Sequence, residues 1–240
     1  TVLKDPAPEY KQATQELIRC SDVLVVRSRF GQNILVDRYG VPEEKIALIY
    51  HGVPDVSPAE SEADKRRLGF EGRFVVLTFG LLSENKGIET VIEALPPVVA
   101  KRPDLLYVIL GATHPEVKKR AGERYREALQ QRVKELALQD NVRFIDQFVE
   151  LDTLLTYISA SDLYITPYLH REQVVSGTLS YALAAGKAII STPYWYAEEL
   201  LADGRGVLVP FRDPQALSQA ILSLIDDPVR MDAVRRAAYD

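Results

Sequence analysis

The chain has 240 residues, of which 47% are hydrophobic and 26% are charged, and its formal net charge is -5 at pH 7. This composition is typical of a folded protein with one large domain or two small ones, and it argues against a largely disordered chain. The negative balance argues against broad electrostatic binding to nucleic acid or to an anionic membrane, so small molecules and other proteins are the expected partners.

The chain has one cysteine, Cys20, and one methionine, Met231. A lone cysteine cannot form an internal disulfide or a cysteine-rich metal site, which favours a reducing, cytoplasmic location. No run approaches the roughly 18 consecutive apolar residues of a membrane span, and the first residues lack the apolar core of a secretory signal. Because the first residue is not methionine, we expect the chain to be a processed product or part of a longer protein.

Short, nearly continuous apolar runs predict strands that are buried on both faces, as in parallel sheets. In chain order, these runs cover residues 23–26, 46–50, 74–79, 105–110, 163–166, 188–190 and 207–209. Helical patterns separate most of the runs. The alternation predicts an α/β fold with a doubly wound parallel sheet.

Three segments between and after these strands carry clear helical patterns. The first begins after Gly87, and the pair Pro96-Pro97 is expected to end or kink it. The second is a long polar helix expected over residues 116–138. The third begins at Asp213-Pro214, a capping acid followed by proline at the first helical position, and its apolar stripe should pack on the sheet.

A linker is predicted at residues 54–64, which are poor in large apolar residues and rich in proline, serine and acid. The part before it has too few elements for a parallel sheet covered on both faces, whereas the part after it is long enough for a complete doubly wound domain. We therefore divide the chain into residues 1–54, the end of another domain with a hinge, and residues 55–240. The strands of the first part should expose apolar surface and unpaired edges, so self-association through it is expected.

Two strand-to-helix turns carry groups that suit a phosphate. One runs from Gly80 to Lys86 after the strand at 74–79, and the other contains Gly177 and Thr178. Backbone N–H groups at a helix N-terminus and a lysine ammonium both attract phosphate. Because parallel sheets gather their ligand-binding loops at the carboxyl ends of the strands, we expect both turns to meet at one cleft. On local pattern alone, a solvated lysine in an ordinary loop is an equally good interpretation of Lys86.

Other polar residues follow the strands with less specific patterns. Glu172 lies in the loop after the strand at 163–166 and is our preferred sugar contact, with a solvated loop as the alternative. His114 can line the same pocket or be incidental, and His51 can be a ligand contact or part of a hinge. Arg126 belongs to a charged helix for which we expect a solvated face. The sequence contains no common metal-binding motif and no Gly-x-Ser-x-Gly nucleophile motif.

Several motifs occur together in the order of a known family. They are Ser21-Asp-Val-Leu-Val-Val-Arg-Ser28, His51-Gly-Val-Pro54, Phe79-Gly-Leu-Leu with Lys86-Gly87, Gly111, Ser161-Asp162, and Ala184-Ala-Gly-Lys187 with residues 189–192. Over about residues 15–238, this series resembles glycosyltransferase family 4. The resemblance implies a GT-B architecture, in which two Rossmann-like domains face a cleft. It also implies retaining transfer, without metal or cofactor, from a nucleotide-sugar donor in polysaccharide or glycoconjugate synthesis.

The same resemblance implies roles for parts of this chain. Residues 55–240 would be the donor-binding carboxyl-terminal domain, and its partners would be a missing amino-terminal domain and a hydroxyl acceptor, either a sugar, a lipid-linked sugar or a small molecule. Lys86 and Glu172 would be the catalytic residues. The donor would be bound by Gly80, Lys86, Gly111, Glu172, Gln173, Ser176, Gly177, Thr178, Leu179 and Tyr181. Among these, Lys86 and the amides of residues 177–179 would stabilise the leaving diphosphate.

Three positions depart from the family pattern. The family usually has two glutamates eight positions apart before the Ala-x-Gly segment, where this chain has Gln173 and Tyr181, and an arginine where it has Leu81. A tyrosine cannot supply a carboxylate for ribose hydroxyls, whereas Glu172 can replace the first glutamate if the loop is one residue longer. The alternative function is therefore a noncatalytic binding or scaffold module that has kept the fold.

Overall fold

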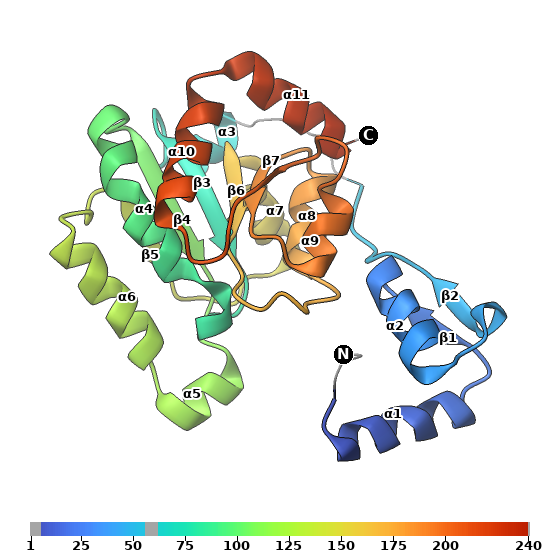
Figure 1. Cartoon of the computed structure of the whole chain (residues 1–240). Helices are drawn as coiled ribbons and strands as arrows, with labels where there is room; N and C mark the ends of the chain where they lie inside the picture. Colours follow the sequence, from blue (N-terminus) through green and yellow to red (C-terminus); the bar gives the residue numbers. More distant parts are fainter. Residues whose placement is uncertain (1–5, 56–61, 240) are drawn as a thin grey trace.

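The computed structural model describes residues 6–55 and 62–239 (Figure 1). Most of the linker predicted at 54–64 lies outside the described residues. The described strands form a two-stranded sheet, β1-β2, and a six-stranded sheet with the order β5-β4-β3-β6-β7-β8. Within the two described ranges, no helix is both long enough and apolar enough to cross a membrane.

The large sheet is parallel throughout. Its strands are β3 (Phe74–Phe79), β4 (Leu105–Leu110), β5 (Val142–Ile145), β6 (Leu163–Thr166), β7 (Ala188–Ser191) and β8 (Val207–Leu208). The chain winds outward from β3 to β5 and then crosses back to β6, so the strand order reverses between β3 and β6. Ligands of doubly wound sheets bind at the carboxyl ends of the strands beside such a reversal. The predicted α/β doubly wound fold is confirmed.

Helices cover both faces of this sheet (Figure 1). One face packs against α4 (Ile88–Lys101), α6 (Arg124–Glu135), α10 (Pro214–Ile225) and α11 (Pro228–Tyr239). The other face packs against α7 (Leu151–Ser159), α8 (Gly177–Ala184) and α9 (Trp195–Leu200), with α3 (Glu62–Leu68) beside α7. Alternate strand residues enter the two layers; for example, Val76 is buried in the first and Leu77 in the second. This alternation explains the continuous apolar runs of the sequence.

Two of the helix predictions need correction. α4 does not end at Pro96-Pro97 but continues through both, because Val98 is buried in the core and its carbonyl accepts a hydrogen bond from the Arg102 amide, so packing holds the last turn. The expected long polar helix is two helices, α5 (Pro115–Ala121) and α6, with Gly122 between them at a φ of 64°. The short strand β5 was missed because it is brief and includes the exposed Arg143.

The amino-terminal elements form a small unit on the opposite side from α6 (Figure 1). They are α1 (Pro8–Cys20), β1 (Leu24–Val26), α2 (Arg29–Tyr39), the 3-10 turn η1 (Glu43–Lys45) and β2 (Ile46–Leu48). Their core is small and centres on Val26, Leu35 and Val41. The unit contacts the large sheet layer through Phe30, which stacks on Trp195 with ring centroids 5.6 Å apart. The domain boundary at residue 54 stays a prediction.

Candidate functional site

The loops that follow β3 and β4 run together at the carboxyl edge of the sheet. The amide of Gly80 donates to the carbonyl of Leu110 at 2.9 Å, and the amide of Leu82 donates to Ala112 at 2.9 Å. Gly111 has to be glycine, because a Cβ there would lie 2.0 Å from the Gly80 oxygen. These contacts hold the loops after β3 and β4 together and bring Gly80 and Gly111, two of the predicted site glycines, side by side.

Gly80 is also the point at which the two predicted turns meet. A Cβ on Gly80 would lie 3.1 Å from Cγ2 of Thr178 and 3.4 Å from Nζ of Lys86. Lys86 comes from the turn after β3, whereas Thr178 lies in the first turn of α8 after β6. The expected convergence of Lys86 and Thr178 is therefore present, although their binding roles stay predictions.

The Lys86 side chain is held at the site by a short loop. The 3-10 turn η2 (Glu84–Lys86) ends at Gly87, which has a φ of 63° and packs so closely on Pro167 that a Cβ would lie 2.1 Å from its oxygen. Nζ of Lys86 donates to the hydroxyl of Tyr168 at 2.5 Å. None of the ion pairs among residues 6–55 and 62–239 includes Lys86. A half-buried cation without a carboxylate partner is well suited to an anionic ligand.

The first turn of α8 presents backbone donors to the same place. Ser176 caps the helix, and its Oγ accepts from the Leu179 amide at 3.3 Å. The Leu179 amide is therefore engaged by the cap of its own helix, and its part in a phosphate cradle stays a prediction. Within the described part of the chain, the amides of Gly177 and Thr178 have no recorded acceptor. They add two donors and the positive end of the helix dipole to the charge of Lys86.

Glu172 lies in a neighbouring pocket rather than beside Lys86. This pocket has a volume of about 420 Å³ and is lined by Asn85 and residues 170–175. Glu172 is exposed there, and no recorded contact joins it to Lys86 or Thr178. The Gln173 side-chain amide accepts from Asn85 at 3.2 Å and donates to the carbonyl of Val175 at 3.1 Å, so both its oxygen and its nitrogen are tethered within the chain. Asn85 precedes Lys86 and so connects the two places.

Tyr181 and His51 meet on the flank of α8. Their rings stand edge to face with centroids 6.2 Å apart. A Cβ on Gly177 would lie 3.0 Å from Nε2 of His51, so this histidine of the amino-terminal unit reaches the helix that carries Thr178. Sequence reasoning left His51 open between a hinge and a ligand contact; the structure places it close to the predicted site.

A small apolar hollow adjoins Gly80 and Gly111. It has a volume of about 100 Å³ and is lined by Phe79, Gly80, Leu81, Leu110, Gly111, Gln147, Phe148, Val149 and Leu154. Leu81, which stands where the family usually has an arginine, therefore lies in an apolar wall. The loop after β5 supplies Gln147, Phe148 and Val149, and sequence reasoning missed their contribution because it missed β5.

Arg126 corrects another expectation, because its side chain is only 5% exposed. It donates to the carbonyl of Gly111 at 3.1 Å and pairs with Asp146 at 2.6 Å. The arginine thus ties the loop after β4 to the end of β5. The helical i, i+3 pair with Glu123 exists at 3.2 Å, but the acceptor on Gly111 comes from elsewhere in the fold and could not be predicted from that spacing.

Hydrogen bonds also set the charge state of Glu123. Its carboxylate accepts from the Thr113 hydroxyl and is next to Lys118 and Arg126, and these contacts, Thr113 foremost, lower its pKa to about 2.

The pKa of the Tyr168 phenol, at the centre of the site, is shifted by opposing effects. Burial raises this pKa, but the charge of Lys86 and the hydrogen bonds to the phenol outweigh burial, so the pKa lies below its ordinary value.

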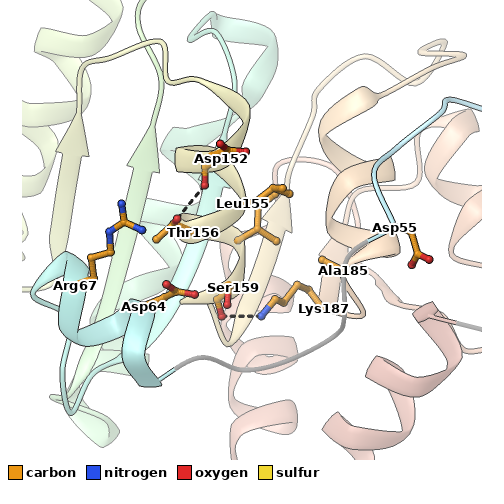
Figure 2. Close-up of a pocket in the computed structure, with 10 residues that line it drawn as sticks. Asp55, Asp64, Arg67, Asp152, Leu155, Thr156, Ser159, Ala185 and Lys187 are labelled. Atoms are coloured by element: carbon orange, nitrogen blue, oxygen red, sulfur yellow. Dashed lines mark hydrogen bonds between the residues drawn. The ribbon is translucent and has the colours of Figure 1, made fainter.

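A second hollow lies at the opposite, amino end of the strands (Figure 2). Its volume is about 580 Å³, and Lys187 is one of its lining residues. The Lys187 ammonium donates to the carbonyls of Ser159 at 3.0 Å and Ser161 at 2.8 Å, so it is already engaged by the backbone. This hollow lies away from the convergence of Lys86 and Thr178.

Comparison with known proteins identifies the family. The profile of "Glycosyl transferases group 1" matches residues 60–240. The chain belongs to this family. Phosphatidyl-myo-inositol mannosyltransferase of Mycolicibacterium smegmatis is 30% identical over 171 residues, which cover 70% of this chain and 40% of that protein. Mannosylfructose-phosphate synthase of Agrobacterium fabrum is 28% identical over 214 residues, which cover 85% of this chain and 45% of that protein.

Solved structures of glycosyltransferases share the fold. The group 1 chain superposes on Anabaena HepE, solved with UDP and glucose, with a TM-score of 0.81 at 22% identity, over 99% of this chain and 64% of that one. The carboxyl-terminal domain of a Francisella tularensis group 1 glycosyl transferase gives a TM-score of 0.68 at 23% identity, over 79% of this chain and 95% of that domain. These matches confirm the predicted GT-B type of fold. The chain spans about half the length of the curated relatives it matches, for example 51% of a Methanocaldococcus jannaschii glycosyltransferase.

Proposed function

We propose that this chain is the donor-binding part of a glycosyltransferase that moves a sugar from a nucleotide-sugar donor to a hydroxyl acceptor. The observation that carries the proposal is the meeting of Lys86 and the α8 N-terminus at Gly80. Within the described residues, the ammonium has no recorded carboxylate partner, and the first amides of α8 have no recorded acceptor. A diphosphate would satisfy both.

The neighbouring surfaces suit the other parts of such a donor. The apolar hollow beside Gly80 offers an apolar surface against which the face of a nucleobase could pack. Tyr181 and His51, whose rings meet on the flank of α8, would contact the ribose. The pocket that contains Glu172 is also lined by Asn85, which precedes Lys86, and it would hold the sugar. The UDP and glucose bound to Anabaena HepE support a uridine nucleotide as the first donor to test.

Catalysis in this proposal is electrostatic and positional. When the bond between the sugar and the diphosphate breaks, negative charge grows on the leaving phosphate oxygens. Lys86 and the amides of Gly177 and Thr178 would stabilise that charge because they are already oriented towards it. We further propose assignment to glycosyltransferase family 4 and a retaining outcome, on the motifs that the chain shares with that family.

The acceptor side would come largely from residues outside this chain, since the relatives are about twice as long. A wall facing the donor site is needed to hold an acceptor hydroxyl against the sugar, and such positioning can contribute up to about 7–11 kcal/mol of barrier reduction. The chain alone is therefore expected to bind the donor weakly without transferring sugar.

A noncatalytic binding module is the second candidate. It is favoured by Gln173, which has a neutral amide in place of the family's carboxylate and is hydrogen-bonded to Asn85 and Val175. The two candidates differ in turnover. A longer protein that includes the amino-terminal half should be incubated with a panel of nucleotide sugars and acceptors, and both nucleoside diphosphate release and glycosylated product should be measured.

Product that disappears in Glu172→Gln but persists in Glu116→Gln, an exposed control on α5, would support transfer with Glu172 at the sugar. Donor binding without product for any acceptor would support the binding module. Absence of binding to every nucleotide sugar would contradict both candidates.

A further inference from the structure

A buried phenol lies between the two groups that define the proposed diphosphate site. The Tyr168 hydroxyl is 2.5 Å from Nζ of Lys86 and 2.9 Å from Oγ1 of Thr178. Tyr168 is only 2% exposed and comes from the loop after β6. Its ring stacks on Tyr194 with centroids 5.1 Å apart, and its carbonyl accepts from the Thr192 hydroxyl at 2.6 Å. The phenol therefore has little freedom to move.

The chemistry of the ammonium fixes the direction of one of these hydrogen bonds. An ammonium can only donate, so Lys86 donates to the Tyr168 oxygen. Either oxygen can donate in the hydrogen bond between the Tyr168 hydroxyl and Oγ1 of Thr178, which holds the Thr178 hydroxyl beside the ammonium. When the phenol donates, the Thr178 hydroxyl keeps its own hydrogen for Ser176, 3.2 Å away, or for an anion. Two of the three ammonium hydrogens of Lys86 are also left for an anion.

We propose that Tyr168 is a positioning residue of the diphosphate site, which orients the Lys86 ammonium and the Thr178 hydroxyl towards an anion on the α8 N-terminus. The inference rests on the proposed function. Tyr168 acts through its neighbours, since its own hydroxyl is already used on both sides.

Leu81 stands where the family usually has an arginine, and this difference explains why the Lys86 ammonium would need a residue that orients it. The site has one matched cation, and a lysine side chain is a flexible point charge, unlike the rigid fork of an arginine. Ordering such a side chain on binding costs conformational entropy. In this chain, Tyr168 holds the ammonium in place before an anion arrives, and the 4.2 Å distance from Nζ to the ring centroid adds a cation–π contact.

Tyr194 provides a matched control. It is also a fully buried tyrosine and stacks on Tyr168, but its hydroxyl lies 3.3 Å from Thr166 and makes no recorded contact with Lys86. Tyr168→Phe and Tyr194→Phe therefore each remove one buried hydroxyl from the same stack. Only the first removes the partner of the cation.

The test is calorimetric titration of the whole chain with inorganic pyrophosphate, UDP and uridine at two salt concentrations. Tyr168→Phe should weaken pyrophosphate and UDP binding by roughly threefold to tenfold, leave uridine binding unchanged, and keep the salt dependence, because the charge remains. Tyr194→Phe should stay within about twofold of the original chain for all three probes. Lys86→Met should lose more affinity and much of the salt dependence.

A second pair of variants covers the case in which Tyr168→Phe does not fold. Thr178→Val removes the hydroxyl that is hydrogen-bonded to the Tyr168 phenol, and Thr166→Val removes the hydroxyl that is hydrogen-bonded to Tyr194. The first should weaken pyrophosphate binding and the second should not. Equal affinities within the pair that folds would overturn the positioning role while the proposed function stands. If the original chain binds neither pyrophosphate nor UDP, the proposed function itself is overturned, and the inference with it.

Discussion

The carboxylate of Glu199 accepts a hydrogen bond of 2.8 Å from the hydroxyl of Tyr50. The same carboxylate accepts from the backbone amide of Arg29 at 2.9 Å, at the start of α2. A side chain of α9 thus supports the first turn of a helix in the amino-terminal unit. Burial, followed by the hydrogen bond to Glu199, raises the pKa of Tyr50. These contacts of Glu199 connect the amino-terminal unit to α9 of the large domain, and the stacked rings of Phe30 and Trp195 provide a further contact between the same two parts.

Glu199→Gln should therefore weaken the contact between α9 and the amino-terminal unit. The amide keeps the size of the side chain but loses the charge that favours a helix N-terminus, so we expect a loss of about 1 kcal/mol in the free energy of unfolding. Urea unfolding measures this loss. Glu198→Gln is the control, because the recorded ion pair of Glu198 within the described residues is with the exposed Arg171, at 3.3 Å, and its loss should be smaller. Equal losses for the two variants would contradict the role of Glu199.

Arg126→Met should destabilise the chain more than a surface arginine variant does. It leaves the Gly111 carbonyl without a charged donor and removes the 2.6 Å pair with Asp146, for which we expect a loss of about 2–3 kcal/mol. Arg132→Met is the control, since its pair with Glu93 is part-exposed and should contribute much less. Chemical unfolding measures the free energy of unfolding of both variants. A smaller loss for Arg126→Met than for Arg132→Met would contradict a stabilising role for the buried Arg126.

Much of the fold can be predicted from this sequence, because the central strands are buried on both faces. The runs at β3, β4 and β6 are continuous and apolar, and their predicted bounds agree with the structure. The prediction fails where tertiary contacts decide the outcome. Examples are the two prolines that α4 accommodates through packing at Val98, and Arg126, whose carbonyl acceptor comes from another loop.

The candidate site shows the same limit. Gly80, Lys86 and Thr178 were predicted because each stands at a strand-to-helix turn, and the carboxyl ends of parallel strands bring such turns together. Tyr168 was missed, since a tyrosine after a buried strand has the sequence signature of an ordinary core residue. Only the folded loops show that its hydroxyl lies between Lys86 and Thr178.

Alkaline pH should unfold the chain through its buried tyrosines. Burial raises the pKa values of Tyr107, Tyr164 and Tyr194, so the folded state keeps protons that an unfolded tyrosine releases near about pH 10. Their contribution to stability is full below that pH and is lost as the pH rises above it. The lowered pKa of Tyr168 acts in the opposite direction and offsets part of the loss. Unfolding free energies measured from about pH 8 to about pH 11 should fall, and a constant or rising stability would contradict this assignment.

Self-association should depend on the exposed strand β1. Val25 of β1 is 59% exposed, and Val23 before β1 and Ile49 after β2 are 57% and 56% exposed, which is a high fraction for apolar residues in and beside a sheet. Val25→Lys should reduce association, because a charge on an edge strand opposes strand pairing. Light scattering over a concentration series measures it. Val229→Lys is the control, since Val229 is 77% exposed on α11, and an equal reduction there would assign the effect to net charge alone.

The most direct test of the donor site is to titrate the chain with UDP and with uridine and to repeat both titrations on Lys86→Met. We predict that UDP binds more tightly than uridine, and that the variant loses UDP affinity by about tenfold or more while uridine affinity is kept, because a charge-assisted contact to phosphate contributes about 1.5–3 kcal/mol. Lys119→Met, on the exposed face of α5, should change neither affinity. Equal losses for UDP and uridine, or no binding of UDP by the original chain, would contradict a diphosphate site at Lys86.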